Sequence, residues 1–491
     1  MDYSQFLVMK QEIGLLVVFL LVFLYDTFMS KRALNSLQGV SIIFFGLLTV
    51  CGFCCACPTA TETAFAGMYV TSPVIACIKN ILNVGVLIVL VQSINWNNSE
   101  AQVVRRGEFL ELVLVTLFGM YLMISARHFL LFIIGLEAAS LPLAALVAFE
   151  KNKYESHEAA IKYILTAVFS SAIFMMGLSY VYMLCGSLYF GEIAAQVATQ
   201  QVSVLLIVAL AFVVAGVGFK LSLVPFHLWT ADVYQGAPTS VTSYLSVISK
   251  GSAAFAFLVI LTQVFGAVYS QVWEWMLYAL IILTITVGNL FALRQTNMKR
   301  FLAFSSISQA GYIMLGIVGN NAMGMASLMF YILVYIFSNL AAFGVIQSIE
   351  NATGKLDMTD YRGLYKSNPK LSFVMMLAMF SLAGIPPFAG FFSKFFIFAG
   401  ALSGPTSIAL YVLVLIALIN TIISLYYYLL VVKAMFLSND EPVIPTFKSA
   451  CSERIGMWVT VAGIVCLGIV SCFYNEILTI CQQYGLLGGL A

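Results

Sequence analysis

Long apolar segments recur along the whole chain, and they limit its fold more than any other feature. Residues 406–436, for example, contain Lys433 as their one charged side chain. A helix needs about 20 consecutive apolar residues to cross the hydrocarbon core of a bilayer. The segments are too long to be strands of a transmembrane barrel, and they lack the alternation of apolar and polar residues that such strands show. The sequence therefore predicts an all-α polytopic membrane protein.

Apolar runs bounded by charged residues, Gly, Pro or Asn predict about 14 membrane-spanning helices. They lie near 13–29, 39–57, 70–92, 109–125, 128–149, 159–184, 203–224, 238–263, 272–293, 301–319, 323–348, 371–400, 406–436 and 455–481. Only 9% of the 491 residues are charged, and 23 Lys and Arg nearly balance 21 Asp and Glu, so no basic surface for nucleic acid is expected. Because the longest connection, 351–370, is too short for a soluble domain, function must lie within the helices.

Positively charged residues outside these segments, together with Lys433 near the end of one, fall on alternate connections. On one side lie Lys31, Arg32, Arg105, Arg106, Lys151, Lys153, Arg294, Lys299, Arg300, Lys355, Arg362, Lys366, Lys370, Lys433, Lys448 and Arg454, and on the other only Lys10 and Arg127. The positive-inside rule places the richer side in the cytoplasm and both termini outside. The first apolar run has no small-residue cleavage pattern at its end, so we expect no cleavable targeting peptide.

Apart from Lys433, near the end of its helix, five basic side chains fall inside the predicted helices: Lys79, Lys162, Lys220, Lys250 and Lys394. A charge at the centre of a membrane helix costs at least about 2.5–3.5 kcal/mol, so such residues are functional candidates. Lys162 is close to a helix end, where its stem can reach the headgroups. Lys79 has polar neighbours in Cys77, Asn80 and Asn83, which leaves a structural and a functional role equally open.

Among the carboxylates, Glu137 is the one expected deep inside a helix. A buried lysine and a buried glutamate each change their proton affinity when they meet and separate, so a Glu–Lys contact can serve as a proton relay without a redox cofactor. The alternative is an ion pair that only holds two helices together. Buried ion pairs stabilise poorly once desolvation is counted, which favours the relay.

Two predicted helices contain internal prolines close to a lysine. Pro225 follows Lys220 in the seventh, whereas Pro386 and Pro387 precede Lys394 in the twelfth. Backbone groups that proline leaves unpaired at membrane depth are tolerated where they line a hydrated cavity. The spacing also predicts two inverted five-helix repeats over 109–263 and 272–436, preceded by a three-helix segment, 1–108, and followed by a last helix, 437–491.

Five ordered motifs carry a family resemblance: Glu137 in the fifth helix, P-F-H-L-W after Lys220, Q-G-A-P before S-x-x-S-K in the eighth helix, N-M-K-R-F-L-A-F-S-S-I-S-Q-A-G-Y in the tenth, and S-L-A-G-I-P-P-F-A-G-F-F-S-K-F in the twelfth. Together they resemble the antiporter-like subunits of respiratory complex I over nearly the whole chain. Of the three paralogues, the largest has an additional lateral helix and the middle one usually carries Glu at the position of Lys394. The sequence therefore resembles the third.

The resemblance implies roles for particular residues. Glu137 pairs with Lys220, Lys250 lies on a central hydrophilic axis, and Lys394 serves the half-channel to the outside. His227 is either a bridge between Lys220 and Lys250 or a packing residue. Family members often have His where this chain has Gln309, so the relay here is expected to depend more on water.

The resemblance also implies a proton-pumping translocase, an NADH:quinone oxidoreductase of the bacterial inner membrane, in which this subunit has no redox centre. NADH, FMN, iron–sulfur clusters and quinone are expected in partner subunits, and the partners are an antiporter-like M subunit and small subunits such as K and J. Two alternatives remain at this point: a stand-alone cation/proton antiporter of the Mrp type, and a non-conducting scaffold.

Four cysteines, Cys51, Cys54, Cys55 and Cys57, cluster at the end of the second predicted helix. No His or acidic residue adjoins them, so a metal site is disfavoured. Small apolar side chains are the preferred interpretation, and an outward-facing disulfide is the alternative.

Overall fold

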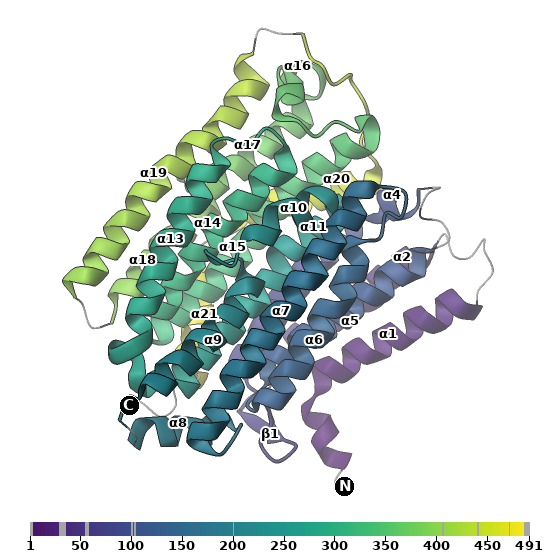
Figure 1. Ribbon diagram of the computed structural model, residues 1–491. Coiled ribbons are helices and arrows are strands. Elements are labelled where there is room, and N and C mark those ends of the chain that lie inside the picture. Colours follow the sequence, from purple (N-terminus) through teal and green to yellow (C-terminus); the bar gives the residue numbers. More distant parts are fainter. Residues whose placement is uncertain are drawn as a thin grey trace.

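Membrane-length helices account for most of the chain (Figure 1). The structure is a computed structural model that describes residues 3–28, 36–54, 58–99, 102, 105–199, 201–404, 407–438, 441–470 and 472–485. Thirteen helices in this part are long and apolar enough to cross a membrane. They are α1 (Lys10–Phe28), α2 (Leu37–Cys54), α3 (Pro73–Gln92), α5 (Arg106–Ser125), α6 (Phe129–Val147), α7 (Tyr154–Cys185), α9 (Val204–Leu221), Thr239–Val264, α13 (Glu274–Ala292), α14 (Met298–Val318), α15 (Ala322–Thr353), α19 (Ile408–Leu437) and α20 (Cys451–Ile469).

The fourteenth crossing is a pair of shorter helices, α17 (Pro369–Ala383) and α18 (Ala389–Leu402). Pro386 and Pro387 lie in the connection between them. A second break follows α9, where Ser222 adopts a left-handed φ of 61° and Pro225 leads into α10 (Leu228–Gly236). Both breaks that the prolines predict are therefore confirmed. The fold class of a polytopic helical protein with broken seventh and twelfth helices is confirmed as well.

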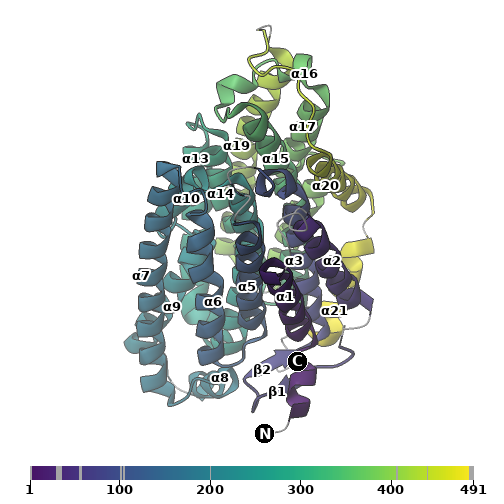
Figure 2. The same ribbon diagram turned by 90° about the vertical axis from the view of Figure 1, so that its right-hand side faces the viewer.

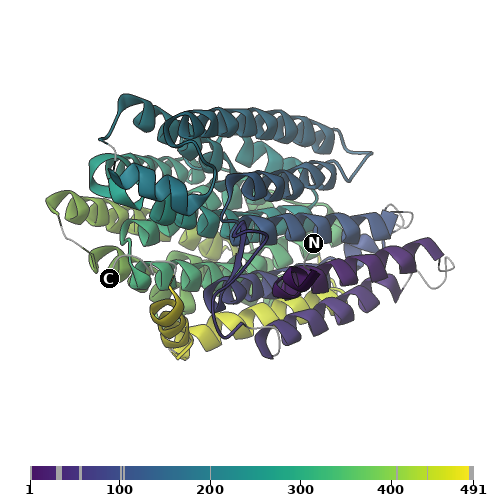
Figure 3. The same cartoon turned by 90° about the horizontal axis from the view of Figure 1, so that it is seen from below.

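Buried helices form the centre of the bundle, and helices with exposed apolar side chains surround them. The segment Thr239–Val264 and helix α14 are buried along their whole apolar stretch, and α15 is mostly buried. Thr239–Val264 comprises α11 (Thr239–Tyr244), the π-helical η4 (Leu245–Ser249), α12 (Lys250–Val259) and the π-helical η5 (Ile260–Val264). Seen from below, the N-terminal helices lie beside the C-terminal α20 and α21 (Cys472–Tyr484) (Figure 3).

The prediction for the last helix, 455–481, is wrong in extent. Helix α20 ends at Ile469, and α21 is a separate helix that buries Tyr474, Ile477 and Cys481 on one face. The spacing of these three side chains gives α21 a single apolar stripe, and its other positions include Asn475 and Glu476. A helix with one apolar stripe lies on the bundle instead of continuing through the membrane.

Short elements occupy the connections. Strands β1 (Glu62–Ala64) and β2 (Tyr69–Thr71) form an antiparallel hairpin near the N-terminal 3₁₀ helix η1 (Tyr3–Val8) (Figure 2). The structure is thus not strictly all-helical. The remaining helices are α4 (Ile94–Asn97), α8 (Phe190–Thr199), α16 (Leu364–Ser367) and the short η6 (Gly266–Val268), η7 (Tyr269–Trp273) and η8 (Met358–Tyr361).

Helices α7 and α15 occupy the same position in the two predicted repeats. Each has 32 residues and ends at a left-handed glycine, Gly186 or Gly354. In both units this long helix is followed by a broken one. The repeat boundaries and the inverted relation of the units remain predictions.

Candidate functional site

Lys220 lies in the last turn of α9, just before the chain leaves helical geometry. The residue is 4% exposed, and its Nζ donates a 2.6 Å hydrogen bond to Ser140 Oγ on α6. Ser140 donates in turn to the backbone oxygen of Leu136 at 2.6 Å. The end of α9 is held by Trp229 of α10, whose indole nitrogen donates to the Phe219 oxygen at 3.1 Å. The broken helix therefore holds a buried ammonium against a hydroxyl of the neighbouring helix.

The expected ion pair between Glu137 and Lys220 is not formed among the residues that the structure describes. Glu137 is half-buried and lies on the outer face of α6, together with Ile134 and Leu141, which are 51% and 49% exposed. Ser140 faces inward, so it is the group that Lys220 reaches. The Glu137 carboxylate is still close enough to interact electrostatically with the ammonium.

Lys250 occupies the centre of the bundle. It is 2% exposed and begins α12, directly after the π-helical segment η4. Its Nζ donates to Ser306 Oγ on α14 at 2.5 Å and lies 5.5 Å from the centroid of the Tyr234 ring. These partners are neutral, so in the described part of the chain no carboxylate holds the Lys250 ammonium. π-Helical turns are frequent at functional sites.

Lys394 lies in α18 and reaches back across the break in the twelfth helix. It is 5% exposed, and its Nζ donates to the backbone oxygens of Leu382 and Ala383, both at 2.9 Å. The Tyr312 ring centroid is 5.3 Å away. Because α17 ends at Ala383, its last carbonyls have no intrahelical partner and carry the negative end of the helix dipole. The proline break thus supplies the ligands of this ammonium.

Gln309 links Lys394 to the interior of the second unit. Its Nε2 donates to the Tyr428 hydroxyl at 3.2 Å and to the Leu382 oxygen at 3.5 Å, the same oxygen that Lys394 contacts. Its Oε1 accepts a hydrogen bond from Tyr331. A cavity of about 10 Å³ lies against Gln309, Tyr331 and Lys394. That volume is about the minimum for one water molecule.

Polar groups also connect this region to Lys250. Tyr428 hydrogen-bonds to Ser305 at 2.5 Å, and the next residue, Ser306, accepts from Lys250. Some buried polar atoms nearby have no protein partner, and buried polar groups of this kind are usually hydrated. They include Ser222 Oγ, Thr230 Oγ1, Ser308 Oγ and Asn339 Oδ1.

His227 is 9% exposed and precedes α10. Among the described contacts it hydrogen-bonds to neither Lys220 nor Lys250, although it interacts electrostatically with Lys250. A direct His227 bridge between the two lysines is therefore absent from this conformation. Trp229, two residues further along the chain, is the side chain that hydrogen-bonds back to the end of α9.

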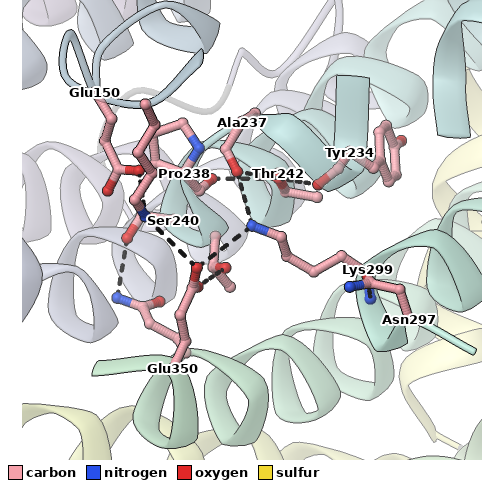
Figure 4. Close-up of polar contacts among 12 residues, drawn as sticks. Glu150, Tyr234, Ala237, Pro238, Ser240, Thr242, Asn297, Lys299 and Glu350 are labelled. Atoms are coloured by element: carbon pink, nitrogen blue, oxygen red, sulfur yellow. Dashed lines mark hydrogen bonds and ion pairs between the residues drawn. The ribbon is translucent and has the colours of Figure 1, made fainter. Parts of the chain in front are cut away.

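A further buried charge cluster lies at the opposite end of the bundle from η1, and sequence reasoning missed it (Figure 4). Lys299 donates to the Ala237 oxygen at 2.9 Å, and its Nζ lies 3.6 Å from Glu350 Oε1. Glu350 also accepts from Thr239, and its Oε1 lies 4.0 Å from Lys153 Nζ. Lys153 and Lys299 were predicted to lie in connections. Lys299 and Glu350 are instead enclosed, because α14 begins before its predicted start at 301 and α15 continues past its predicted end at 348, whereas Lys153 is exposed.

The partner of Lys79 was also not predicted. Lys79 is fully buried and pairs with Glu12, which is 1% exposed. The Tyr69 hydroxyl donates to the other Glu12 oxygen at 2.7 Å. Glu12 is therefore a buried carboxylate that the sequence did not predict, although it lies at a helix start and outside the predicted helix 13–29. Glu12 stands in the first turn of α1, and the structure encloses it between Lys79 and Tyr69.

Lys162 differs from the other four basic residues. Its side chain is 41% exposed, and its Nζ lies 2.6 Å from Asp232 Oδ2 and 2.7 Å from Glu158 Oε1. Helix α7 begins at Tyr154, before the predicted 159, and the preceding turn carries Glu158. Lys162 therefore lies near the surface, as its position near a helix end predicts.

The cysteine cluster can be described in part. Cys51 and Cys54 are exposed and free, whereas Cys55 and Cys57 lie outside the described residues, as do Lys31 and Arg32. Within the described ranges no group of three His, Cys, Asp or Glu side chains is arranged to hold a metal ion.

Several known proteins are similar to this chain in sequence and in fold. The family model "NADH:quinone oxidoreductase/Mrp antiporter, TM" matches residues 126–424, more than half of the chain. NADH-quinone oxidoreductase subunit N of Phocaeicola vulgatus is 52% identical over 476 residues, which cover 97% of this chain and 98% of the relative. A chain of respiratory complex I from Thermus thermophilus with bound aureothin is 31% identical, with a TM-score of 0.74 over 98% of both chains.

A chain of the Mrp complex from Dietzia has the same fold, with a TM-score of 0.81 over 99% of this chain and 100% of its own, at 19% identity. The buried lysines beside broken helices and these matches define the class: the chain belongs to the membrane family shared by NADH:quinone oxidoreductases and Mrp antiporters. Within that family it belongs with subunit N of NADH-quinone oxidoreductase. This match confirms the prediction, based in part on Lys394, that the chain resembles the third of the three antiporter-like paralogues.

Proposed function

We propose that this chain translocates protons as a membrane-arm subunit of NADH-quinone oxidoreductase, and is thus part of a translocase of the bacterial inner membrane. The observation that carries the proposal is the set of three lysines at 2–5% exposure, each beside an irregular helix segment. NADH, FMN, iron–sulfur clusters and quinone would be held by partner subunits, and electron transfer there would drive the movement of protons here.

The contacts of the three lysines suit a relay. Lys220, Lys250 and Lys394 bind hydroxyl or carbonyl oxygens, which accept hydrogen bonds from a charged ammonium. None is locked to a carboxylate in the described contacts, so a small electrostatic change can shift a proton between sites. We assign loading from the cytoplasm to Lys220, lateral transfer to Lys250 and outward release to Lys394. Water would join them, with His227 and Gln309 orienting it.

Glu137 is proposed to tune Lys220 from the outer face of α6. A carboxylate on a lipid-facing helix surface is costly, so this face is expected to be covered by a neighbouring membrane subunit. The M subunit and small subunits such as K and J are the proposed partners of the complex. Movement of a charge across that contact would change the proton affinity of Lys220, which couples the subunits electrostatically.

The test is Lys220→Met in the assembled complex, reconstituted into proteoliposomes. Methionine keeps the length and apolar stem of the side chain but carries no proton. We expect proton pumping and coupled NADH oxidation to fall together by about 10-fold or more, a barrier change of at least about 1.4 kcal/mol. Lys433→Met, on the exposed surface of α19, is the matched control and should pump normally.

The two alternatives make different predictions. A scaffold would tolerate Lys220→Met with normal pumping, and that outcome in a fully assembled complex would refute the relay. A stand-alone antiporter would exchange cations for protons when this chain alone is placed in liposomes. We expect no such exchange by the isolated chain.

A further inference from the structure

A cavity of about 380 Å³ opens at the end of the bundle that carries α16. Helices α17 and α20 and the segment 446–449 surround it, and Figure 2 shows α17 and α20 side by side below α16. Leu371, Val374, Met457 and Trp458 line its apolar part. The cavities beside Gln309 and Glu12 measure only about 10 Å³. This groove is therefore large enough for part of a small amphiphilic molecule.

The walls of the groove are held in place by hydrogen bonds. Asn368 Nδ2 donates to the Pro445 oxygen at 3.0 Å, and the Phe447 amide donates back to Asn368 Oδ1 at 3.2 Å. Ser348 donates to Ser449 at 2.8 Å. These bonds attach the 446–449 segment to α17 and α15, so the groove is preformed.

Three cations stand on the rim: Lys370, Lys448 and Arg454. All three are exposed, and in the described part of the chain none forms an ion pair. The nearest acid in sequence, Glu453, is 2% exposed and accepts hydrogen bonds from Asn95 at 3.0 Å and Asn351 at 2.8 Å. Because Glu453 turns inward, the positive charge of the rim is not neutralised.

The groove lies where membrane helices begin. Pro369 starts α17 and Cys451 starts α20, and Trp458 is about 10 Å further along α20 at 1.5 Å per residue. Trp458 is 55% exposed, and the nearby apolar residues Ile455 and Phe373 are 53% and 45% exposed. Tryptophan at this depth is typical of the boundary between headgroups and hydrocarbon. Cations thus stand above an exposed apolar helix surface.

We propose that this groove binds the headgroup of one anionic phospholipid. The phosphate would contact Lys370, Lys448 and Arg454, and the acyl chains would extend along the apolar faces of α17 and α20 past Trp458. Charge complementarity selects this occupant, because unpaired basic pockets between membrane helices recognise anionic headgroups. The site is separate from the relay lysines, so it does not depend on the function proposed above.

The first experiment compares lipid retention by the assembled complex. Complexes are placed in nanodiscs of phosphatidylcholine with a minor fraction of phosphatidylglycerol, and tightly held lipid is quantified by mass spectrometry. The groove variant combines Lys370→Gln, Lys448→Gln and Arg454→Gln. Its matched control, Lys151→Gln, Arg294→Gln and Lys433→Gln, removes the same charge from other exposed positions.

We expect the groove variant to retain one phosphatidylglycerol fewer per complex than the wild type, and the control to retain the wild-type number. Equal retention by all three complexes would overturn the proposal. NADH oxidation, measured in parallel, shows that each variant complex is assembled.

A second measurement identifies the occupant if the groove variant fails to assemble. A photoreactive benzophenone amino acid replaces Trp458 in the otherwise unchanged complex, and illumination joins it to whatever lies in the groove. An adduct with the mass of phosphatidylglycerol, enriched over phosphatidylcholine relative to the nanodisc mixture, is expected. An adduct with another subunit, or with both lipids in the mixture ratio, would show that the groove is a protein contact or an unselective surface and would overturn the proposal.

Discussion

Buried charges in this chain have very different partners, and this difference supports different proposed roles for them. Lys79 has a full ion pair with Glu12, with Tyr69 donating to the same carboxylate. Lys250 has a serine and an aromatic ring. An ion pair holds both charges in one state, whereas neutral ligands leave the proton of a lysine exchangeable. We therefore regard Glu12–Lys79 as a link between α1 and α3, and Lys220, Lys250 and Lys394 as the proposed relay.

Removing one partner of this pair should be costly. Glu12→Ala leaves the Lys79 ammonium buried without its counter-charge, and we expect a loss of about 3–5 kcal/mol in the free energy of unfolding. Replacing both, with Glu12→Gln and Lys79→Met, removes the two charges together and should recover most of that loss. Thermal unfolding of the purified complex in detergent measures both. Equal destabilisation by the single and double variants would contradict this account.

At the scale of single elements, the helix ends position the site. Gly390, in the first turn of α18, packs against the last turns of α17: a Cβ there would lie 1.6 Å from the backbone oxygen of Ser381. The Gly390 amide also donates to Ser381 Oγ at 3.2 Å. This close approach brings Lys394, one turn further along, to the free carbonyls of α17. Glycine is required because no side chain fits between the two helices.

Gly390→Ala should therefore separate the two halves of the broken helix. We expect destabilisation of at least about 1–3 kcal/mol, together with reduced proton pumping, because Lys394 moves away from its carbonyl ligands. The control is Gly39→Ala in α2, where a Cβ would meet nothing within 4 Å. Complex yield and pumping per NADH oxidised are the measurements. Wild-type yield and pumping in Gly390→Ala would show that neither assembly nor pumping requires the close packing at this break.

Helix α6 begins with a cap that responds to pH. His128 Nδ1 accepts from the Leu130 amide at 3.1 Å, and burial lowers the pKa of His128 below its ordinary 6.5, although the charge of Glu192 opposes this shift. The cap is complete above pH 6.5, and its contribution is lost as the pH falls through the lowered pKa, because a protonated ring cannot accept the bond.

His128→Asn should remove this pH dependence, since asparagine caps helices without titrating. Relative to the variant, the wild type should lose about 1 kcal/mol of stability between about pH 7.5 and about pH 5.5. The thermal midpoint of the complex at several pH values tests this. Parallel curves for the two proteins would show that protonation leaves the cap intact.

At the scale of the whole molecule, η1 and the end of α21 lie at the same end of the described bundle, which we propose is one face of the membrane (Figure 1). The loops rich in Lys and Arg, including those that carry Lys151 and Arg294, lie at the other face, which the positive-inside rule assigns to the cytoplasm. The groove between α17 and α20 and the Lys299–Glu350 cluster lie at that same face. Loading of protons and binding of an anionic headgroup would therefore occur on the cytoplasmic side.

Orientation can be tested directly. Single cysteines at Lys151 and at Glu62, in a variant without its native exposed cysteines, should react from opposite sides with a membrane-impermeant maleimide. We expect Glu62→Cys to be labelled in intact spheroplasts and Lys151→Cys only after the membrane is opened. The reverse pattern would place both termini in the cytoplasm and invert the proposed direction of loading and release.

The sequence alone determined the number of crossings, the two broken helices and the lysines beside them. These features depend on local properties, because an apolar stretch must cross the bilayer and proline interrupts a helix wherever it occurs. Gln309 was singled out only by the family resemblance, as a position where His is frequent. The structure shows that Gln309 and Lys394 both contact the Leu382 oxygen.

Only the tertiary structure decided which groups meet. Glu12 pairs with Lys79 of a distant helix, Lys220 contacts Ser140 in place of Glu137, and α21 lies on the bundle instead of crossing with α20. Each outcome depends on how helices far apart in sequence rotate and pack, since a rotation of one helix exchanges the residue that faces its neighbour. Hydrophobicity places a helix in the membrane, but the contacts between helices select the partner of each buried charge.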